Sequence, residues 1–303
     1  MKSIIALFIL LGAVSCIPGG NSKENKEAKA RTEKVGKLSL NKAEIDKYKF
    51  EINGVELTES KIPYGCLIAF KIKGLEGFKE TKGKVMLDAS VTGYNNKSEE
   101  IFALKDLFAE EFPNGCPVES FSDFLRLTLR CQTPMKMNET YKIVFTVKDK
   151  ASEAKVEVAE NFTMIPTPGL VYEERGIASD GPFLLNSKDV NNALSDNKIS
   201  AGDTISVYFT TIEGLTEKDG LVRPNGSVKF CNEYGDVITE VKDIYKSYGE
   251  KGVEASLVKQ QISMRLFLPS DLKSGKKYSA TFSLADKNDK TKELSAKYDF
   301  TIK

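Results

Sequence analysis

Residues 277–286 read KYSATFSLAD, and residues 140–149 read TYKIVFTVKD. In the later segment, aromatic or apolar side chains at every second position (278, 280, 282 and 284) alternate with serine or threonine. A period of two with aromatic and apolar residues predicts a strand that has one buried and one exposed face. The earlier segment has Tyr141 and Phe145 at the positions of Tyr278 and Phe282, and both segments end on an aspartate. We therefore expect the same strand twice.

The repetition extends to both sides of these segments. Five further matches keep one order along the chain, at offsets between 137 and 143 residues: 67–72 with 204–209, 83–87 with 226–230, 105–108 with 242–245, 126–129 with 265–268, and 162–164 with 300–302. Six matches in one order indicate two copies of one domain. The turn-forming residues 166–169 (Pro-Thr-Pro-Gly) mark the break between them.

The repeated unit is predicted to be all-β. Strand-like segments recur with few helical stretches between them, which favours an antiparallel sandwich. Gly275 and its counterpart Asn138 both tolerate a positive φ, as a tight turn before the strand requires. A length of 303 residues also suggests about two domains. We place them at residues 48–165 and 166–303.

The stretch from Pro269 to Asp286 resembles the late half of a bacterial immunoglobulin-like domain. It contains Leu272, a turn at Gly275, a strand led by Tyr278 and the aspartate-containing turn. The resemblance covers most of residues 199–303 and, more loosely, 62–165. It implies two tandem immunoglobulin-like antiparallel β-sandwich domains, although the chain has no tryptophan of the kind typical of antibody domains. Such domains serve as spacers, adhesin modules and enzyme accessories, so the resemblance implies a fold and no activity.

The N-terminus predicts export. Lys2 precedes an apolar run over residues 4–14, which is too short to span a bilayer of about 30 Å. The sequence Ala-Val-Ser-Cys at 13–16 then resembles a bacterial lipobox, which implies a signal peptide over 1–15 and acylation of Cys16. An ordinary signal peptide with an incidental Cys16 is the alternative. Residues 16–47 are rich in lysine and glutamate and predict a flexible tether.

Composition narrows the possible functions. The chain has 44 basic and 43 acidic side chains, so it lacks the positive charge of a nucleic-acid binder, and we expect no nucleic-acid partner. It has no histidine, which excludes Ser-His-Asp and Cys-His catalysis and histidine-ligated zinc. The oxygen-rich run at 286–289 suits calcium in ligand type, but Lys287 lies inside it. We expect no cofactor, no metal and no enzymatic activity.

Four cysteines remain after Cys16. Cys66 begins an early strand and Cys131 ends a late one, so a disulfide between them is expected if the two strands pair antiparallel. A Cys116–Cys131 bridge and no bridge at all are the alternatives. Cys231 is expected to point outward as a thiol.

Only the first copy carries apolar residues at helical spacing between 101 and 112. We expect a short helix that either packs on the sandwich or presents Phe108 and Phe112 as aromatic anchors for a partner. These observations predict a non-enzymatic lipoprotein of the bacterial cell envelope, held at the outer membrane or cell surface by its lipid. Its partner would be a protein or a glycan. The alternative is a structural spacer or a subunit of an envelope complex.

Overall fold

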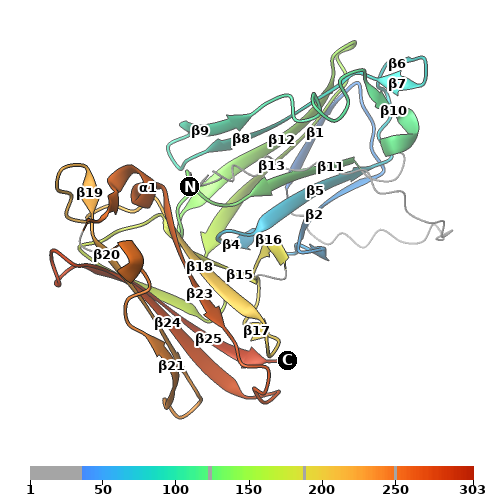
Figure 1. Ribbon diagram of the computed structural model, residues 1–303. Helices are drawn as coiled ribbons and strands as arrows, with labels where there is room; N and C mark the ends of the chain where they lie inside the picture. The colour runs from blue at the N-terminus through green and yellow to red at the C-terminus, as the bar shows by residue number, and fades with distance from the viewer. Residues whose placement is uncertain (1–35, 122–124, 187–188, 249–250) are drawn as a thin grey trace. The chain divides into compact units, whose positions relative to one another are not determined.

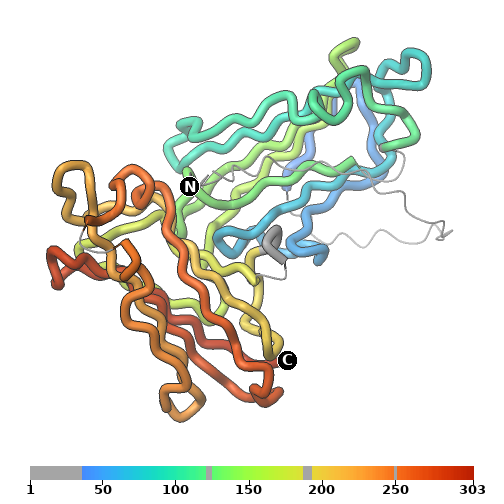
Figure 2. The backbone as a smooth tube through the Cα atoms, viewed as in Figure 1, coloured from blue at the N-terminus to red at the C-terminus, as the bar shows by residue number. Residues whose placement is uncertain are grey.

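The computed structural model describes residues 36–121, 125–186, 189–248 and 251–303, which are drawn in colour in Figure 2. The predicted signal peptide, Cys16 and residues 16–35 of the predicted tether lie outside these residues. Within the described remainder of that tether, Lys37–Asn41 is a strand and not flexible chain. Contacts divide the chain into two compact units. The first contains residues up to Ser60, Leu67–Arg130 and Thr140–Phe162; the second contains Lys61–Cys66, Cys131–Glu139 and Thr163–Lys303. The second unit thus includes two short segments from the first sequence repeat.

The first repeat forms two main antiparallel sheets (Figure 1). One has the order β1 (Lys37–Asn41), β13 (Lys155–Ile165), β12 (Thr140–Asp149), β8 (Leu87–Tyr94) and β9 (Glu100–Leu104), with β4 (Lys61–Pro63) pairing parallel to the end of β13. The other has the order β11 (Leu125–Arg130), β5 (Leu67–Lys73), β2 (Lys47–Ile52) and β3 (Val55–Glu56). A small sheet of β10 (Cys116–Pro117), β7 (Lys84–Val85) and β6 (Glu80–Thr81) precedes a 3-10 turn at Val118–Phe121.

The second repeat has the same plan. Its larger sheet has the order β14 (Leu170–Arg175), β25 (Glu293–Ile302), β24 (Lys277–Asp286), β20 (Pro224–Cys231) and β21 (Val237–Val241), with β17 (Lys198–Ile199) parallel to β25. The smaller sheet has the order β16 (Asp189–Ala193), β15 (Gly181–Asn186), β18 (Thr204–Thr210) and β23 (Gln261–Phe267). β19 (Leu221–Val222) pairs with β22 (Val253–Glu254), next to α1 (Ala255–Gln260) and a 3-10 turn at Lys246–Tyr248. The prediction of all-β sandwich domains is confirmed.

Strand register relates most strands of the two repeats by an offset of 137 residues, whereas β13 and β25 are related by 138, since Thr163 lies opposite Lys61 and Thr301 lies opposite Lys198. Leu67 lies opposite Arg130 and Thr204 lies opposite Phe267; Leu87 lies opposite Asp149 and Pro224 lies opposite Asp286. Each residue is 137 positions from its counterpart. Two of the sequence matches are therefore out of register, because 87–94 corresponds to 224–231 and 125–130 corresponds to 262–267. Strand pairing sets the correct alignment, because the two mismatched offsets differ from 137 by even numbers and so keep the same alternation of buried residues.

The buried faces of the strands follow the predicted alternation. Phe282 and Leu284 on β24 are fully buried, as are Phe145 on β12 and Phe209 on β18. In the first repeat Phe50, Phe70 and Phe145 form an aromatic cluster with ring centroids 5.1–5.3 Å apart. The predicted tight turns are confirmed too, because Asn138 and Gly275 have φ values of 65° and 77°.

One buried carboxylate recurs in both copies. Asp149 accepts hydrogen bonds from the backbone N–H of Lys79 (2.8 Å) and of Ala151 (2.9 Å) and from the Ser152 hydroxyl (2.6 Å). Asp286 accepts from the N–H groups of Thr216 (2.6 Å) and Asn288 (2.8 Å), which are the residues 137 positions after Lys79 and Ala151. In each copy the carboxylate lies at the end of a strand in the larger sheet, β12 or β24. It accepts a hydrogen bond from the segment that follows β5 or β18 in the smaller sheet. Asp286 therefore has a structural role in the second copy.

Phe282→Ala is expected to lower the free energy of unfolding by about 3–5 kcal/mol, because a fully buried aromatic side chain is lost from the second unit. Denaturant unfolding measures this loss. Phe267→Ala is the control, since Phe267 is 75% exposed in the same unit and its truncation is expected to change little. A loss below about 1 kcal/mol for Phe282→Ala would contradict the assigned core.

Asp149 also predicts a pH dependence of stability. Burial alone would raise the pKa of Asp149, but the hydrogen bonds from Ser152, Ala151 and Lys79 outweigh it and hold that pKa below its ordinary value. The stabilisation is therefore complete above the unfolded pKa of about 3.9 and is lost as the pH falls through the lower folded pKa.

Asp149→Asn is expected to lower the free energy of unfolding by about 1–3 kcal/mol at pH 7, because a set of charge-assisted hydrogen bonds is lost. It is also expected to make the free energy of unfolding depend less on pH in the acid range. Urea unfolding between pH 7 and pH 2 measures both effects. Asp271→Asn, at an exposed position, is the control. An acid limb that keeps its full slope in Asp149→Asn would contradict the role given to this carboxylate.

Candidate functional site

The segment predicted to be a helix is not one. Residues 100–104 form strand β9, and residues 107–111 form a turn, so the helix prediction over 101–112 is wrong. Apolar residues spaced three and four apart arise here because an edge strand is followed directly by a turn. Phe108 is 1% exposed and packs against the half-buried Phe112, with ring centroids 6.1 Å apart. The structure thus places Phe108 in the core of the first unit, while the binding role of Phe112 stays a prediction.

The cysteine prediction is right about proximity. β5 and β11 pair antiparallel, and beyond their ends the N–H of Cys131 donates to the carbonyl of Cys66 (2.9 Å), while the N–H of Gly65 donates to the carbonyl of Cys131 (2.7 Å). Both residues are nevertheless buried thiols, so the predicted Cys66–Cys131 disulfide is not formed in the structure. The reason is orientation: the Cys66 sulfur lies 3.7 Å from the carbonyl oxygen of Ala193. Cys231 is buried at the end of β20 and does not point outward as expected.

A buried hydroxyl network in the second unit was not found from the sequence. The Tyr64 hydroxyl lies 3.2 Å from the Thr210 hydroxyl and accepts the N–H of Thr133 (3.1 Å), and the Thr133 hydroxyl donates to Asp180 (2.8 Å). Burial raises the pKa of Tyr64, which keeps the phenol protonated as a donor. The network joins segments of both sequence repeats within one unit. It could not be predicted from a local sequence pattern, because its residues are far apart in the chain.

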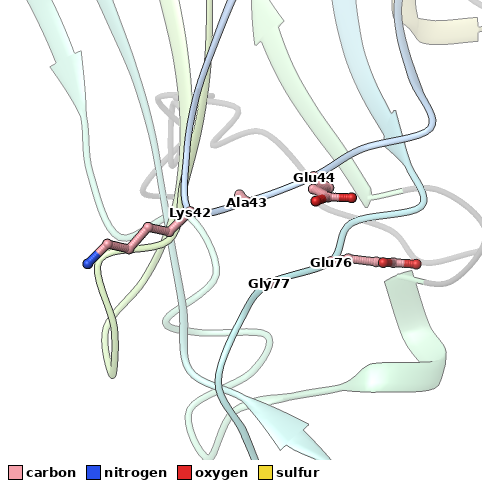
Figure 3. A pocket seen from close by; sticks show the side chains of 5 residues that line it. All are labelled: Lys42, Ala43, Glu44, Glu76 and Gly77. Carbon is pink, nitrogen blue, oxygen red and sulfur yellow. The ribbon is translucent and has the colours of Figure 1, made fainter.

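A shallow hollow on the first unit is lined by Lys42, Ala43, Glu44, Glu76 and Gly77 (Figure 3). Glu44 and Glu76 exchange backbone hydrogen bonds (2.9 and 3.1 Å), and their exposed side chains point the same way. Two solvated carboxylates do not form a cage for a cation. Within the part of the chain that the structure describes, no group of three or more Cys, Asp or Glu side chains is placed to hold a metal ion.

The strongest candidate surface is strand β21, the outer strand of the larger sheet in the second unit (Figure 1). All five of its residues are exposed, including Val237 (51%), Ile238 (41%) and Val241 (46%). Tyr234, in the turn that leads into the strand, is 80% exposed. Because an edge strand also has backbone N–H and C=O groups directed away from its sheet, we name Val237–Val241 the β21 edge and treat it as the candidate binding surface.

Two other edge strands of the second unit carry side-chain contacts. In the smaller sheet of the second unit, the hydroxyl of Tyr245 donates to the carbonyl of Ser263 on the outer strand β23 (2.9 Å). β14, at the opposite border of the larger sheet, has Arg175 paired with Glu293 and Glu174 bound to the N–H of Ser179. Charged groups discourage strand addition. β21 also has one such pair, Glu240 with Lys242 (3.6 Å), at its C-terminal end.

The counterpart of β21 in the first unit is different. Residues 101–104 of β9 are half-buried, and the ring of Phe102 lies so close over Gly93 that a side-chain carbon at position 93 would be 2.2 Å from it. The two copies therefore share a framework but differ in the exposure of this strand.

Comparisons with known proteins point to no activity for this chain. No family model matches the chain, and no curated protein does. Among solved structures, the chain is similar to the C-terminal domain of wzt (TM-score 0.31, 11% identity, 43% of this chain and 77% of that one). It is also similar to a beta-glucuronidase of Bacteroides uniformis (TM-score 0.28, 12% identity, 88% of this chain and 32% of that one). A putative beta-galactosidase from Bacteroides fragilis gives a TM-score of 0.26 at 10% identity, with 87% of this chain and 41% of that one covered. At these scores the likeness carries no argument, and the chain spans only about a third of the glucuronidase.

Within the described residues, no helix has the length and apolar character needed to cross a bilayer.

Phe108→Ser is expected to lower the melting temperature by several degrees, because a buried aromatic side chain is replaced by a polar one. Phe112→Ser removes a half-buried ring and is expected to have the smaller effect. Thermal unfolding followed by circular dichroism measures both. Equal melting temperatures for Phe108→Ser and the wild type would contradict the burial of Phe108 and return it to the candidates for a binding anchor.

Proposed function

We propose that this chain is a lipid-anchored protein of the bacterial cell envelope that acts by binding another macromolecule. The observation that supports binding best is the β21 edge. It combines exposed β-branched side chains with backbone groups that a second extended chain can pair with, which is the basis of recognition by strand addition. A protein partner fits this surface better than a glycan, because paired backbone groups require a peptide.

The proposed anchor rests on the sequence before residue 36. An apolar run of eleven residues ending in Ala-Val-Ser-Cys at 13–16 is typical of a lipoprotein signal. Acylation at Cys16 with several chains would hold the protein durably, since each buried methylene contributes about 0.8 kcal/mol and one chain alone is marginal. The lysine- and glutamate-rich segment that follows would give the sandwich units reach above an outer membrane or cell surface.

A subunit or spacer of an envelope complex is the second candidate. The duplicated sandwich supports it, because two copies of one framework lengthen a chain without adding a new chemical site. We do not propose catalysis, since the acidic groups of the Lys42–Gly77 hollow are exposed and solvated.

Cys16→Ala is expected to release the protein from the membrane fraction and to abolish incorporation of a radiolabelled fatty acid. Fractionation and labelling of cells that express either form measure this. Ser15→Ala is the matched control, because a small residue is kept beside an intact cysteine. Membrane retention of Cys16→Ala equal to that of the wild type would contradict the anchor.

Binding is tested separately with intact cells. Photocrosslinking from position 238 is expected to capture a protein, and the equivalent probe at Val171 on β14 is expected to capture far less, because Glu174 and Arg175 on that border are already engaged within the unit. Equal capture from both positions would contradict the assignment of the binding surface to β21.

A further inference from the structure

The outer face of the smaller sheet in the first unit concentrates positive charge. On β2, β5 and β11, one set of alternate residues is buried in the core, among them Phe50, Phe70 and Leu127. The residues between them therefore lie on the opposite face of the sheet. We name the basic residues at one end of this opposite face the basic face: Lys47, Lys49, Lys71, Lys73 and Arg126.

Strand pairing brings these five residues together. Lys47 lies directly opposite Lys73, and Lys49 lies directly opposite Lys71. On its other side Lys71 lies opposite Arg126. Neighbouring strands are about 4.8 Å apart and alternate residues of a strand about 6.7 Å, so the five side chains begin within an area of about 10 by 7 Å.

Two carboxylates on the same side of the sheet offset part of this charge. The Nζ atoms of Lys49 and Lys71 lie 2.8 and 2.6 Å from the buried carboxylate of Glu51, which holds the two ammonium groups side by side. Glu56 on β3 lies opposite Glu51 and is exposed. Five basic groups against these two acidic groups leave an excess of three positive charges on this part of the sheet.

The sandwich framework does not require this charge. Like charges in direct opposition destabilise a pair of strands. In the second copy, where Val207 is the counterpart of Phe70, no charged residue occupies an equivalent position: the counterparts are Gly181, Phe183, Tyr208, Thr210 and Ser263. One copy thus folds without any of these bases, whereas the other keeps all five in spite of their repulsion. A local feature that opposes stability is typical of a functional surface.

We propose that the basic face binds the anionic headgroups of a lipid bilayer. Lysine and arginine side chains near an anionic bilayer are attracted to it, and a basic cluster can add a second attachment to a lipid anchor. The face belongs to an open sheet, which suits contact with a planar surface. This inference rests on the proposed lipid anchor, and it adds an orientation of the first unit on the membrane.

The place where the described chain begins favours a bilayer over a free polyanion. Cys16 precedes Gly36 by twenty residues, and a flexible chain of twenty residues spans about 25 Å root-mean-square. The carbonyl of Gly36 accepts a hydrogen bond from the hydroxyl of Tyr48 (2.7 Å), the residue between Lys47 and Lys49. The predicted tether therefore ends beside a strand of the basic face. An acylated Cys16 would give that face a high effective concentration at the bilayer.

Vesicle sedimentation of the full chain tests the proposal. Every form carries Cys16→Ala, so that no acyl chain contributes, and the apolar run at 4–14 is common to all forms. The parent is expected to bind vesicles of equal parts phosphatidylglycerol and phosphatidylcholine at least about tenfold more tightly than vesicles of phosphatidylcholine alone. High salt is expected to remove the difference.

The test variant is Lys47→Gln with Lys73→Gln. It is expected to weaken binding to the anionic vesicles at least about tenfold. Its melting temperature is expected to be unchanged or higher, because two directly opposed like charges are removed. The matched control is Lys273→Gln with Lys277→Gln, which changes the net charge equally at two exposed positions of the second unit and is expected to leave binding unchanged.

Three results would overturn the proposal. The first is a parent that binds both kinds of vesicle equally, and the second is an equal loss of binding in the test and control variants. The third is a parent that leaves anionic vesicles unbound but binds soluble dextran sulfate through the same lysines, which would assign the face to a polysaccharide. Anionic vesicle binding together with no fatty acid on the wild-type Cys16 would remove the anchor and keep the face, so the two failures are distinguishable.

Discussion

The carboxylate buried at the end of β12 and again at the end of β24 is the constraint on which each sandwich depends. A buried charge is costly unless hydrogen bonds satisfy it, and in each copy backbone N–H groups from two separate segments do so. One of these segments follows the central strand of the opposite sheet. The carboxylate therefore holds the end of a strand in one sheet next to a segment of the other sheet, which fixes the relative position of the two sheets. Its donors recur at one offset, so the duplication preserved the bonds themselves as well as the aspartate.

Much of the fold was accessible from the sequence because burial in a strand leaves a local signature. Alternation around Phe145 and Phe282 predicted both strands and their buried faces correctly, and Asn138 and Gly275 identified their turns. The errors arose where local patterns are ambiguous. Apolar residues between 101 and 112 fit a helical period but form a strand and a turn, because periodicity over so few residues cannot separate the two. Sequence similarity also aligned residues 83–87 with 226–230, whereas strand pairing shows that 87–94 is the counterpart of 224–231.

The candidate site could not be predicted for a different reason. Nothing in the residues of β21 says that the strand lies at the border of its sheet, since that depends on the order in which distant strands assemble. Its counterpart β9 holds the same place and is half-buried, so position alone does not decide exposure either. The Tyr64 network is hidden in the same way, because its hydroxyl partners belong to segments that meet only after folding.

The inclusion of Lys61–Cys66 and Cys131–Glu139 in the second unit means that the duplicated domains are no longer interchangeable modules. A gene cut at the Pro-Thr-Pro-Gly break would deliver a second sandwich without Tyr64 and Thr133, leaving Thr210 and Asp180 without those hydroxyl partners. The second sandwich thus relies on two segments of the first repeat. A cut that keeps this unit intact must therefore carry residues 61–66 and 131–139 along with the second repeat.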